Sequence, residues 1–400
     1  MPLTRRDWMA VTGAAAAASA WPAGLHAGDT APPLPPALSP DVFRDRQARL
    51  RAAAKTSGMD VLFATPSTNL AYCANLAIGR SERLTALLLF TDGPAVLVTP
   101  YFEAENHRRD AVVDDVLTWK EDEDPEALVA KTLGKSRTVG IEGSTAYQAA
   151  AKLRAAAPLE ARDATPVFDA LRMVKSADEQ AFIREAARRT TLAIAATHKR
   201  LSRGMTESEV STLLEGELQK LGVHGGGLVQ FGPSSALPHG GPGDRKLAVG
   251  DVVLIDAGCK VRGYTSDVTR TVSFGPPSDE LRKVYAAVNR AQLAGIDALA
   301  AGASGEDVDR AARRVIEEAG YGAFFTHRLG HGLGMDGHEP PYLVRGNRAP
   351  LSSGNTVTIE PGIYLPGRFG VRIEDDYCAA GAAPPVSLSA RPGELVVLPA

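Results

Sequence analysis

Residues 250–274 read GDVVLIDAGCKVRGYTSDVTRTVSF, and they carry two carboxylates, Asp256 and Asp267, within runs that otherwise favour β-structure. Residues 252–255 are apolar and predict a buried strand, and residues 264–272 predict a second strand. Both acids therefore lie in a predicted hairpin. For a single pair of this kind, a surface hairpin with two solvated aspartates is the commoner explanation.

The turn of this hairpin is predicted at Arg262 and Gly263, because glycine adopts a positive φ without strain. If the hairpin is centred between Val261 and Arg262, Asp256 and Asp267 lie directly opposite each other, with Cβ atoms about 4.5–5.5 Å apart. Two buried carboxylates at that distance repel each other, and one of them would have to bind a proton. A pair of cations about 3.5–4 Å apart would remove this conflict.

A similar pattern occurs a second time, and this favours the metal interpretation over the surface hairpin. The matched segments are 204–222 with 302–320, 250–258 with 354–362, and 263–267 with 370–374, and His239 matches His338. The matches indicate an internal repeat of about one hundred residues. We expect the two halves to face each other across a pseudo-twofold axis and to bring four carboxylates to one centre: Asp256, Asp267, Glu360 and Glu374.

The length and composition exclude some classes of protein. The chain has 400 residues, enough for two domains, and a formal net charge of −3. It has no basic patch with interleaved aromatic residues, so we expect no nucleic-acid partner. The three cysteines are an odd count and predict no disulfide framework. By strand alternation Cys259 faces away from Asp256, so we do not expect it to bind metal.

Residues 1–30 have the features of a signal peptide, so they are expected to lie outside the folded domains. Arg5 and Arg6 precede a weakly apolar, alanine-rich run, and this pattern resembles a twin-arginine export signal. An ordinary secretory signal and an uncleaved anchor are the alternatives. No later run approaches the ~20 apolar residues that span a bilayer. We therefore expect an exported, periplasmic protein with no stable membrane span after processing.

The rest of the chain divides into a spacer and two domains. Residues 31–40 are proline-rich and predict an extended spacer. Residues 41–168 alternate helical and strand-like segments, which predicts a small α/β domain. In residues 169–400, capping boxes at Ser176 and Thr206 begin long helices, and strands follow them. This order predicts an α+β domain whose helices cover one face of a mostly antiparallel sheet.

A histidine completes the candidate metal site. His331 lies in RLGHGLG, residues 328–334, where three glycines allow the backbone to approach a ligand closely. With the four acids of the repeat it forms a set of five candidate ligands: Asp256, Asp267, His331, Glu360 and Glu374. Four carboxylates and one imidazole are mostly oxygen donors, which suits two divalent metal ions. We expect manganese, with cobalt or zinc as alternatives.

The motifs around these residues resemble those of the creatinase/prolidase/aminopeptidase P family, the proline-specific branch of the pita-bread metallopeptidases. The motifs that carry the resemblance are PHG at 238–240, DAG at 256–258, GYTSDVTRT at 263–271, GHGLGMDGHEPP at 330–341, EPGIY at 360–364 and VRIEDD at 371–376. The resemblance extends from residue 41 to the end of the chain. It implies a pita-bread catalytic domain with an internal pseudo-twofold repeat, preceded by a smaller creatinase-like N-terminal α/β domain.

The resemblance also implies roles for individual residues. The five candidate ligands match the family's metal ligands, and Glu360 also matches the carboxylate that transfers a proton. His239 and His338 match the family's substrate-binding histidines, and Arg372 matches an arginine near the metals. One departure is the run Met335-Asp-Gly337 before His338, where relatives usually carry bulkier residues. The shape of the nearby pocket is therefore left open.

The activity implied by the resemblance is hydrolysis of Xaa-Pro bonds by a binuclear metal-dependent peptidase, through a metal-bridging hydroxide. The substrate would be a small peptide with proline at its second position. Both a dipeptidase (prolidase) and an aminopeptidase P fit this pattern. The alternatives are another hydrolase or lyase on the same fold and, less favoured, a non-catalytic binding protein. Relatives are commonly dimers, so we expect a homodimer.

A dipeptidase has to recognise the free carboxylate of the C-terminal proline, most economically with an arginine fork. The loop VRGNRAP at 344–350 carries Arg345 and Arg348. Prolidases place a carboxylate-binding arginine in this interval of the chain. We therefore expect Arg345 to bind the substrate carboxylate; two solvated arginines on a surface loop are the alternative.

Overall fold

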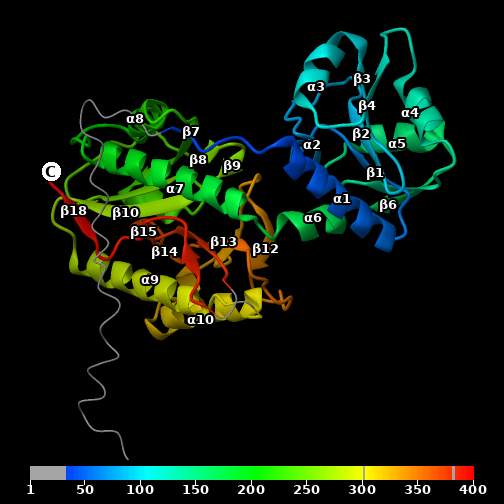
Figure 1. Ribbon diagram of the computed structural model, residues 1–400. Coiled ribbons are helices and arrows are strands. Elements are labelled where there is room, and N and C mark those ends of the chain that lie inside the picture. The colour runs from blue at the N-terminus through cyan, green and yellow to red at the C-terminus, as the bar shows by residue number, and fades with distance from the viewer. Residues whose placement is uncertain (1–32, 301, 381–382) are drawn as a thin grey trace, which may run out of the picture.

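The computed structural model describes residues 33–300, 302–380 and 383–400, which form two lobes joined through helix α6 (Thr165–Arg172) (Figure 1). The predicted signal peptide, residues 1–30, lies outside the described residues. The proline-rich spacer contacts the second lobe, where the Pro35 carbonyl oxygen accepts a hydrogen bond from Arg262 Nε at 2.8 Å. Within the described part of the chain, no helix is long and apolar enough to cross a membrane.

The N-terminal lobe is built on a six-stranded mixed sheet in the order β4-β3-β2-β1-β5-β6. Its strands are β1 (Val61–Ala64), β2 (Ala86–Phe90), β3 (Ala95–Pro100), β4 (Asp115–Trp119), β5 (Thr138–Ile141) and β6 (Glu160–Asp163). Its helical elements are α1 (Pro40–Thr56), α2 (Thr68–Ala74), η1 (Tyr101–Glu103), α3 (Ala104–Asp110), α4 (Pro125–Leu133) and α5 (Tyr147–Ala156). Apolar clusters cover both faces of the sheet, and Phe168 and Leu171 of α6 belong to one of them.

The second lobe consists of two halves with the same order of elements. The first half contains α7 (Ala177–His198), α8 (Glu207–Lys220), β7 (Gly225–Phe231), η2 (Gly232–Ala236), β8 (Val252–Val261), β9 (Tyr264–Thr265) and β10 (Val268–Phe274). The second half contains α9 (Asp279–Ala298), α10 (Gly305–Glu318), η3 (Gly322–Phe324), β11 (Gly330–Gly332), β12 (Glu339–Leu343), β13 (Thr356–Ile359), β14 (Gly362–Leu365), β15 (Phe369–Arg372) and β16 (Asp375–Cys378). The chain ends with β17 (Val386–Ser387), beside β16, and β18 (Val396–Leu398), beside β10.

Each half buries a helix pair against its own strands. In the first half, side chains of α7 and α8 pack on β8 and β10, with Phe182, Leu214 and Ile255 in one cluster. In the second half, α9 and α10 pack on β13 through residues such as Val288 and Ile359. Figure 1 shows β10 of the first half and β14 and β15 of the second half lying between α7 and α9. Most strand pairs in this lobe are antiparallel, as the sequence predicts.

Backbone conformations follow the internal repeat. Gly204 and Gly302, which precede α8 and α10, have φ angles of 91° and 90°. Gly250 and Gly354, which precede β8 and β13, both have a φ of 91°. Positive φ angles favour glycine, so the matched glycines mark equivalent chain reversals. The first turns of α8 and α10 also carry the same capping-box hydrogen bonds.

The acid-bearing hairpin of the first half forms as predicted, but the predicted register is wrong. Arg262 and Gly263 form a two-residue turn with φ angles of 52° and 85°, a favoured hairpin geometry. This turn moves the centre of the hairpin to a point between these two residues. Asp256 consequently pairs with Thr269 instead of Asp267. Because side chains alternate with a period of two, Asp267 still lies on the same face, as a diagonal neighbour of Asp256.

Candidate metal centre

A cavity of about 390 Å³ lies where the strands of the two halves meet, and eight of the nine predicted site residues line it. These eight are His239, Asp256, Asp267, His331, His338, Glu360, Arg372 and Glu374. Asp256 lies within β8, and Asp267 directly precedes β10. Glu360 follows β13, Glu374 directly precedes β16, and His331 is the central residue of β11. Both halves of the repeat therefore contribute acids to one cavity.

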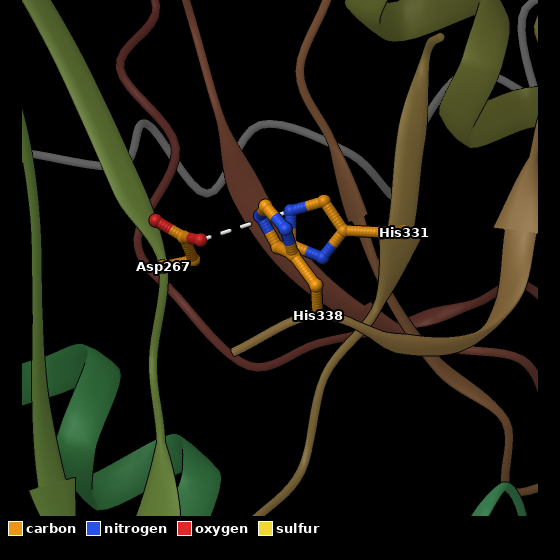
Figure 2. Close-up of side chains that lie close together, drawn as sticks. All are labelled: Asp267, His331 and His338. Carbon is orange, nitrogen blue, oxygen red and sulfur yellow. Dashed lines mark ion pairs between the residues drawn. The ribbon is translucent and has the colours of Figure 1, made fainter. Parts of the chain in front are cut away.

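The candidate ligand atoms lie close together in three overlapping groups, each with its atoms within 4.8 Å of one another. The groups are Asp256, Asp267 and Glu374; His331, Glu360 and Glu374; and Asp267, His331 and His338. Figure 2 shows Asp267 facing the two imidazole rings across the cavity. The Nε2 atom of His331 lies 3.7 Å from Asp267 Oδ2 and 3.2 Å from Glu360 Oε1. All five predicted metal ligands belong to these groups.

Hydrogen bonds fix the orientation of His331. Its Nδ1–H donates to the carbonyl oxygen of Gly332 at 3.0 Å, which directs Nε2 at the acids. A metal-binding histidine is commonly oriented in this way, with one ring N–H donated to the backbone and the other nitrogen facing the ion. The neighbouring glycines are needed for close strand packing, because a Cβ atom on Gly330 would overlap the carbonyl oxygen of Thr358. A Cβ atom on Gly332 would likewise overlap the carbonyl oxygen of Glu339.

The electrostatics of the cavity favour a bound cation. Burial, and then the charge of Asp256, raises the pKa of Asp267 well above its ordinary value. Burial and the charge of Asp267 raise the pKa of Glu374 in the same way. Four carboxylates this close cannot all be ionised without compensating positive charge. Carboxylate oxygens and one unprotonated imidazole nitrogen are a donor set that fits divalent metal ions.

Arg372 is buried, and all three nitrogens of its guanidinium donate hydrogen bonds within the site. Its Nη2 donates to Asp256 Oδ2 at 2.6 Å, Nε to Thr269 Oγ1 at 3.0 Å and Nη1 to the Tyr364 hydroxyl at 2.8 Å. The Thr269 hydroxyl in turn donates to Glu374 Oε2 at 2.6 Å. The predicted position of Arg372 on the same side as Glu374 agrees with a distance of 3.9 Å between Arg372 Nε and Glu374 Oε2. Arg372 thus orients acids from both halves.

The two predicted substrate-binding histidines both line the cavity, and both are exposed. The ring centroid of His338 lies 3.9 Å from that of His331. Partial burial of the ring, and then neighbouring positive charge that includes Arg328, lower the pKa of His338. A neutral His338 can donate one N–H group to a substrate. His239 lies on the turn that follows η2.

The structure does not bring Arg345 to the site. Its side chain is exposed and does not line the cavity. The loop that carries it folds back against the start of α10, where Gly346 N donates to Glu306 Oε2 at 2.6 Å. Arg348 lies 3.7 Å from the same glutamate. These contacts hold the loop against α10, and Arg345 lies outside the cavity lining.

Three further residues take part in the site and were missed from the sequence. His327 and Arg328 line the cavity, and Tyr364 bonds to two of its residues. His327 Nδ1 donates to the carbonyl oxygen of Arg328 at 2.7 Å, and its Nε2 accepts from the Tyr364 hydroxyl at 2.9 Å. His327 is four residues from His331, and Tyr364 belongs to the EPGIY motif. Their closeness in sequence to His331 and Glu360 could have marked His327 and Tyr364 as site residues. The hydrogen bond between them depends on the fold and could not be predicted from the sequence.

Repeated acid-bearing hairpins that converge with one histidine, covered by two helix pairs and preceded by an α/β lobe, define the pita-bread class of metallohydrolases. The chain belongs to metallopeptidase family M24, which matches residues 181–379, and the creatinase/prolidase N-terminal domain matches residues 46–174. The predicted fold, a creatinase-like α/β domain followed by a pita-bread α+β domain, is confirmed by these matches and by solved relatives. The protein is therefore an enzyme of the metallopeptidase class.

Similar proteins include several dipeptidases. The crystal structure of dipeptidase PepE from Mycobacterium ulcerans has a TM-score of 0.86 and 36% identity, and the match covers 91% of this chain and 100% of that chain. Xaa-Pro dipeptidase from Bacillus anthracis has a TM-score of 0.83 and 32% identity, over 89% of this chain and 100% of that chain. An uncharacterized peptidase of Staphylococcus aureus is 37% identical over 320 residues, 79% of this chain and 91% of the relative.

Proposed function

We propose that the protein hydrolyses Xaa-Pro dipeptides with two divalent metal ions held by Asp256, Asp267, His331, Glu360 and Glu374. The observation that carries the proposal is the convergence of these five side chains, from both halves of the repeat, in one cavity. The names of the solved relatives support the dipeptidase class. Manganese is the proposed metal because the donors are mostly carboxylate oxygens, with cobalt or zinc as alternatives. A homodimer is proposed as the assembled form.

When bound, such ions acidify a water molecule and polarise the scissile carbonyl group. The chain's own residues supply the proton transfers and the orientation. Glu360 accepts the proton of the attacking water and passes it to the leaving proline nitrogen. In support of this role, Glu360 follows β13, lines the cavity and lies 3.2 Å from His331 Nε2. Protonation of the secondary amine completes cleavage of the bond.

His239 and His338 have a separate role in the proposal. Each can donate an N–H group to negative charge that develops on the substrate carbonyl oxygen. Arg372 acts through Asp256, because its 2.6 Å hydrogen bond to Asp256 Oδ2 holds that carboxylate in the lining of the cavity. The arrangement therefore separates the residues that contact substrate from those that hold the ligands in place.

The test combines metal analysis with a choice of substrates. The purified protein should contain two equivalents of divalent metal, and it should lose hydrolysis of Gly-Pro when a chelator removes them. Gly-Pro should be cleaved faster than the tripeptide Ala-Pro-Ala. The reverse preference would indicate an aminopeptidase P, and turnover of creatine without peptide turnover would indicate another hydrolase of this fold. Bound metal without turnover of any of these compounds would favour a binding protein.

A further inference from the structure

Two arginines line the cavity, Arg328 and Arg372, and only Arg372 is hydrogen-bonded to a candidate metal ligand. The guanidinium of Arg372 donates to Asp256, Thr269 and Tyr364. Arg328 also lines the cavity, yet among the described residues its guanidinium forms no hydrogen bond or ion pair with a side chain. The guanidinium instead lies over the ring of Tyr342, whose centroid is 4.4 Å from the Arg328 Cζ atom. Arg328 is therefore a cation with donors available to a ligand.

The backbone that carries Arg328 is held firmly. His327 Nδ1 donates to the Arg328 carbonyl oxygen at 2.7 Å. Arg313 of α10 donates to the carbonyl oxygens of His327 at 2.8 Å and of Phe325 at 3.0 Å. Tyr342, on which the guanidinium stacks, is the cross-strand partner of His331. The contact therefore holds the guanidinium beside the strand pair that bears a candidate metal ligand.

The geometry of a dipeptide sets a requirement that Arg328 meets. The carboxylate of an Xaa-Pro dipeptide is one residue beyond the scissile bond, and consecutive Cα atoms are about 3.8 Å apart. A group that binds this carboxylate must therefore line the same cavity as the candidate metal ligands. Arg328 lines that cavity, whereas the exposed Arg345 does not. The planar guanidinium fork also matches the two oxygens of a carboxylate.

We propose that Arg328 binds the free C-terminal carboxylate of the substrate and so restricts the enzyme to dipeptides. This assignment rests on the proposed Xaa-Pro hydrolysis. A tripeptide or a dipeptide amide presents a neutral carbonyl and an N–H group where the dipeptide presents a charge. Such a substrate offers Arg328 no carboxylate. The guanidinium is already partly buried, so it would lack a charged hydrogen-bond partner and the substrate would bind more weakly.

The central experiment compares Ala-Pro with Ala-Pro-amide in wild-type enzyme and in Arg328→Gln. The variant should lower kcat/KM for Ala-Pro by about 10- to 100-fold, the loss typical of a hydrogen bond to a charged group. For Ala-Pro-amide the change should stay below about threefold, within the range of a neutral surface substitution. Arg328→Lys should recover part of the preference, because it keeps the charge but loses the fork. Arg345→Gln is the matched control and should leave both substrates unchanged.

Two further measurements separate this role from a structural one. Bound metal and circular dichroism of Arg328→Gln should match the wild type. Calorimetric titration with proline and with prolinamide should show that Arg328→Gln weakens only proline binding. Equal losses on Ala-Pro and its amide, or equal affinity of the wild type for proline and prolinamide, would overturn the assignment. If the wild type cleaves no peptide, the proposed function fails, and the two titrations still decide what Arg328 binds.

Discussion

The two halves of the catalytic domain present their acids in different ways. In the first half, β8 and β10 pair directly, and Asp256 faces Thr269. In the second half, β13 pairs with β16, and the chain between them forms the β14–β15 hairpin, the counterpart of the β8–β9 turn in the first half. The pair of Ile359 with Asp375 implies that Glu360 and Glu374 are directly opposite when the same register continues. The β14–β15 hairpin also carries Arg372, which bonds to the first half's Asp256. Divergence after duplication thus gave one half the cation that orients the other half's acid.

The two repeat-related histidines differ in a second way. The loop before β12 that carries His338 is held by cations from the segment between the lobes. Arg172 Nη2 donates to Asp336 Oδ2 at 2.6 Å and to Glu339 Oε2 at 2.5 Å. Lys175 Nζ donates to Glu339 Oε1 at 2.5 Å. His239 lies on a turn with no such anchor among the described residues. Cations of the connecting segment therefore hold the loop of His338, whereas the N-terminal lobe reaches the first half at Tyr264, whose hydroxyl accepts a hydrogen bond from Arg46 at 2.8 Å.

The largest expected effect comes from changing the acids that each half contributes to the candidate metal centre. Asp267→Asn should lower hydrolysis by at least about a thousandfold, because a neutral amide is a poor substitute for a ligand whose metal contributes several kcal/mol. Glu374→Gln, the equivalent change in the second half, should cost as much. Elemental analysis should show lost metal while circular dichroism stays native. Asp122→Asn, in an exposed turn, is the control. Full activity in either acid variant would contradict a centre shared by both halves.

The second effect tests the link from Arg372 to Asp256. Arg372→Met removes the guanidinium that holds the mostly buried Asp256, and it leaves that carboxylate without its partner. Loss of one partner of a buried pair costs about 3 kcal/mol in unfolding free energy. Arg368→Met is the control, because its 2.6 Å pair with Glu280 is exposed and should contribute less than about 1 kcal/mol. Calorimetry of the metal-free variants measures both losses of unfolding free energy. Equal losses would mean that Arg372 does not hold Asp256 more firmly than an exposed ion pair does.

The site could be predicted from the sequence where it depended on periodicity and repetition. Alternation along one strand was enough to place Arg372 beside Glu374, and the repeat was enough to pair the acids. Alternation alone could not predict the register of the first hairpin. When the centre of the turn moves by one residue, each cross-strand partner moves by two, and every side chain keeps its face of the sheet. The prediction for Arg345 rests on its interval of the sequence alone, and that interval folds against the start of α10. Arg328 instead depends on stacking against Tyr342, a contact that no spacing reveals.

The third effect concerns the anchored histidine. Arg172→Met should lower kcat/KM about tenfold, because release of the loop displaces His338 from its position against the substrate. The same change in a His338→Ala background should cost almost nothing, since the residue that it positions is already absent. Metal content should not change. Arg200→Met, which removes a surface pair with Glu217, is the control. Additive losses in the double variant would mean that Arg172 supports the fold and not His338.

The smallest effect tests whether the halves are still equivalent away from the site. Thr206 accepts a hydrogen bond from Glu209 N at 3.1 Å at the start of α8, and Ser304 accepts one from Asp307 N at 3.1 Å at the start of α10. In both capping boxes the carboxylate of the acidic residue accepts a hydrogen bond from the backbone N–H of the capping residue. Removal of an N-cap hydroxyl typically costs about 1 kcal/mol.

Thr206→Ala and Ser304→Ala should therefore each lower the unfolding free energy by about 1 kcal/mol, and the two losses should agree within about 0.5 kcal/mol. Thr206→Gly and Ser304→Gly are matched controls and should cost less, because glycine exposes the first-turn N–H groups to water. Chemical denaturation measures all four values. Neither alanine variant should change kcat/KM, since both helix starts lie outside the cavity. A loss in one half without a loss in the other would show that divergence extends to the helices. Equal losses would confine the divergence to the strands and loops that carry the acids and the histidines.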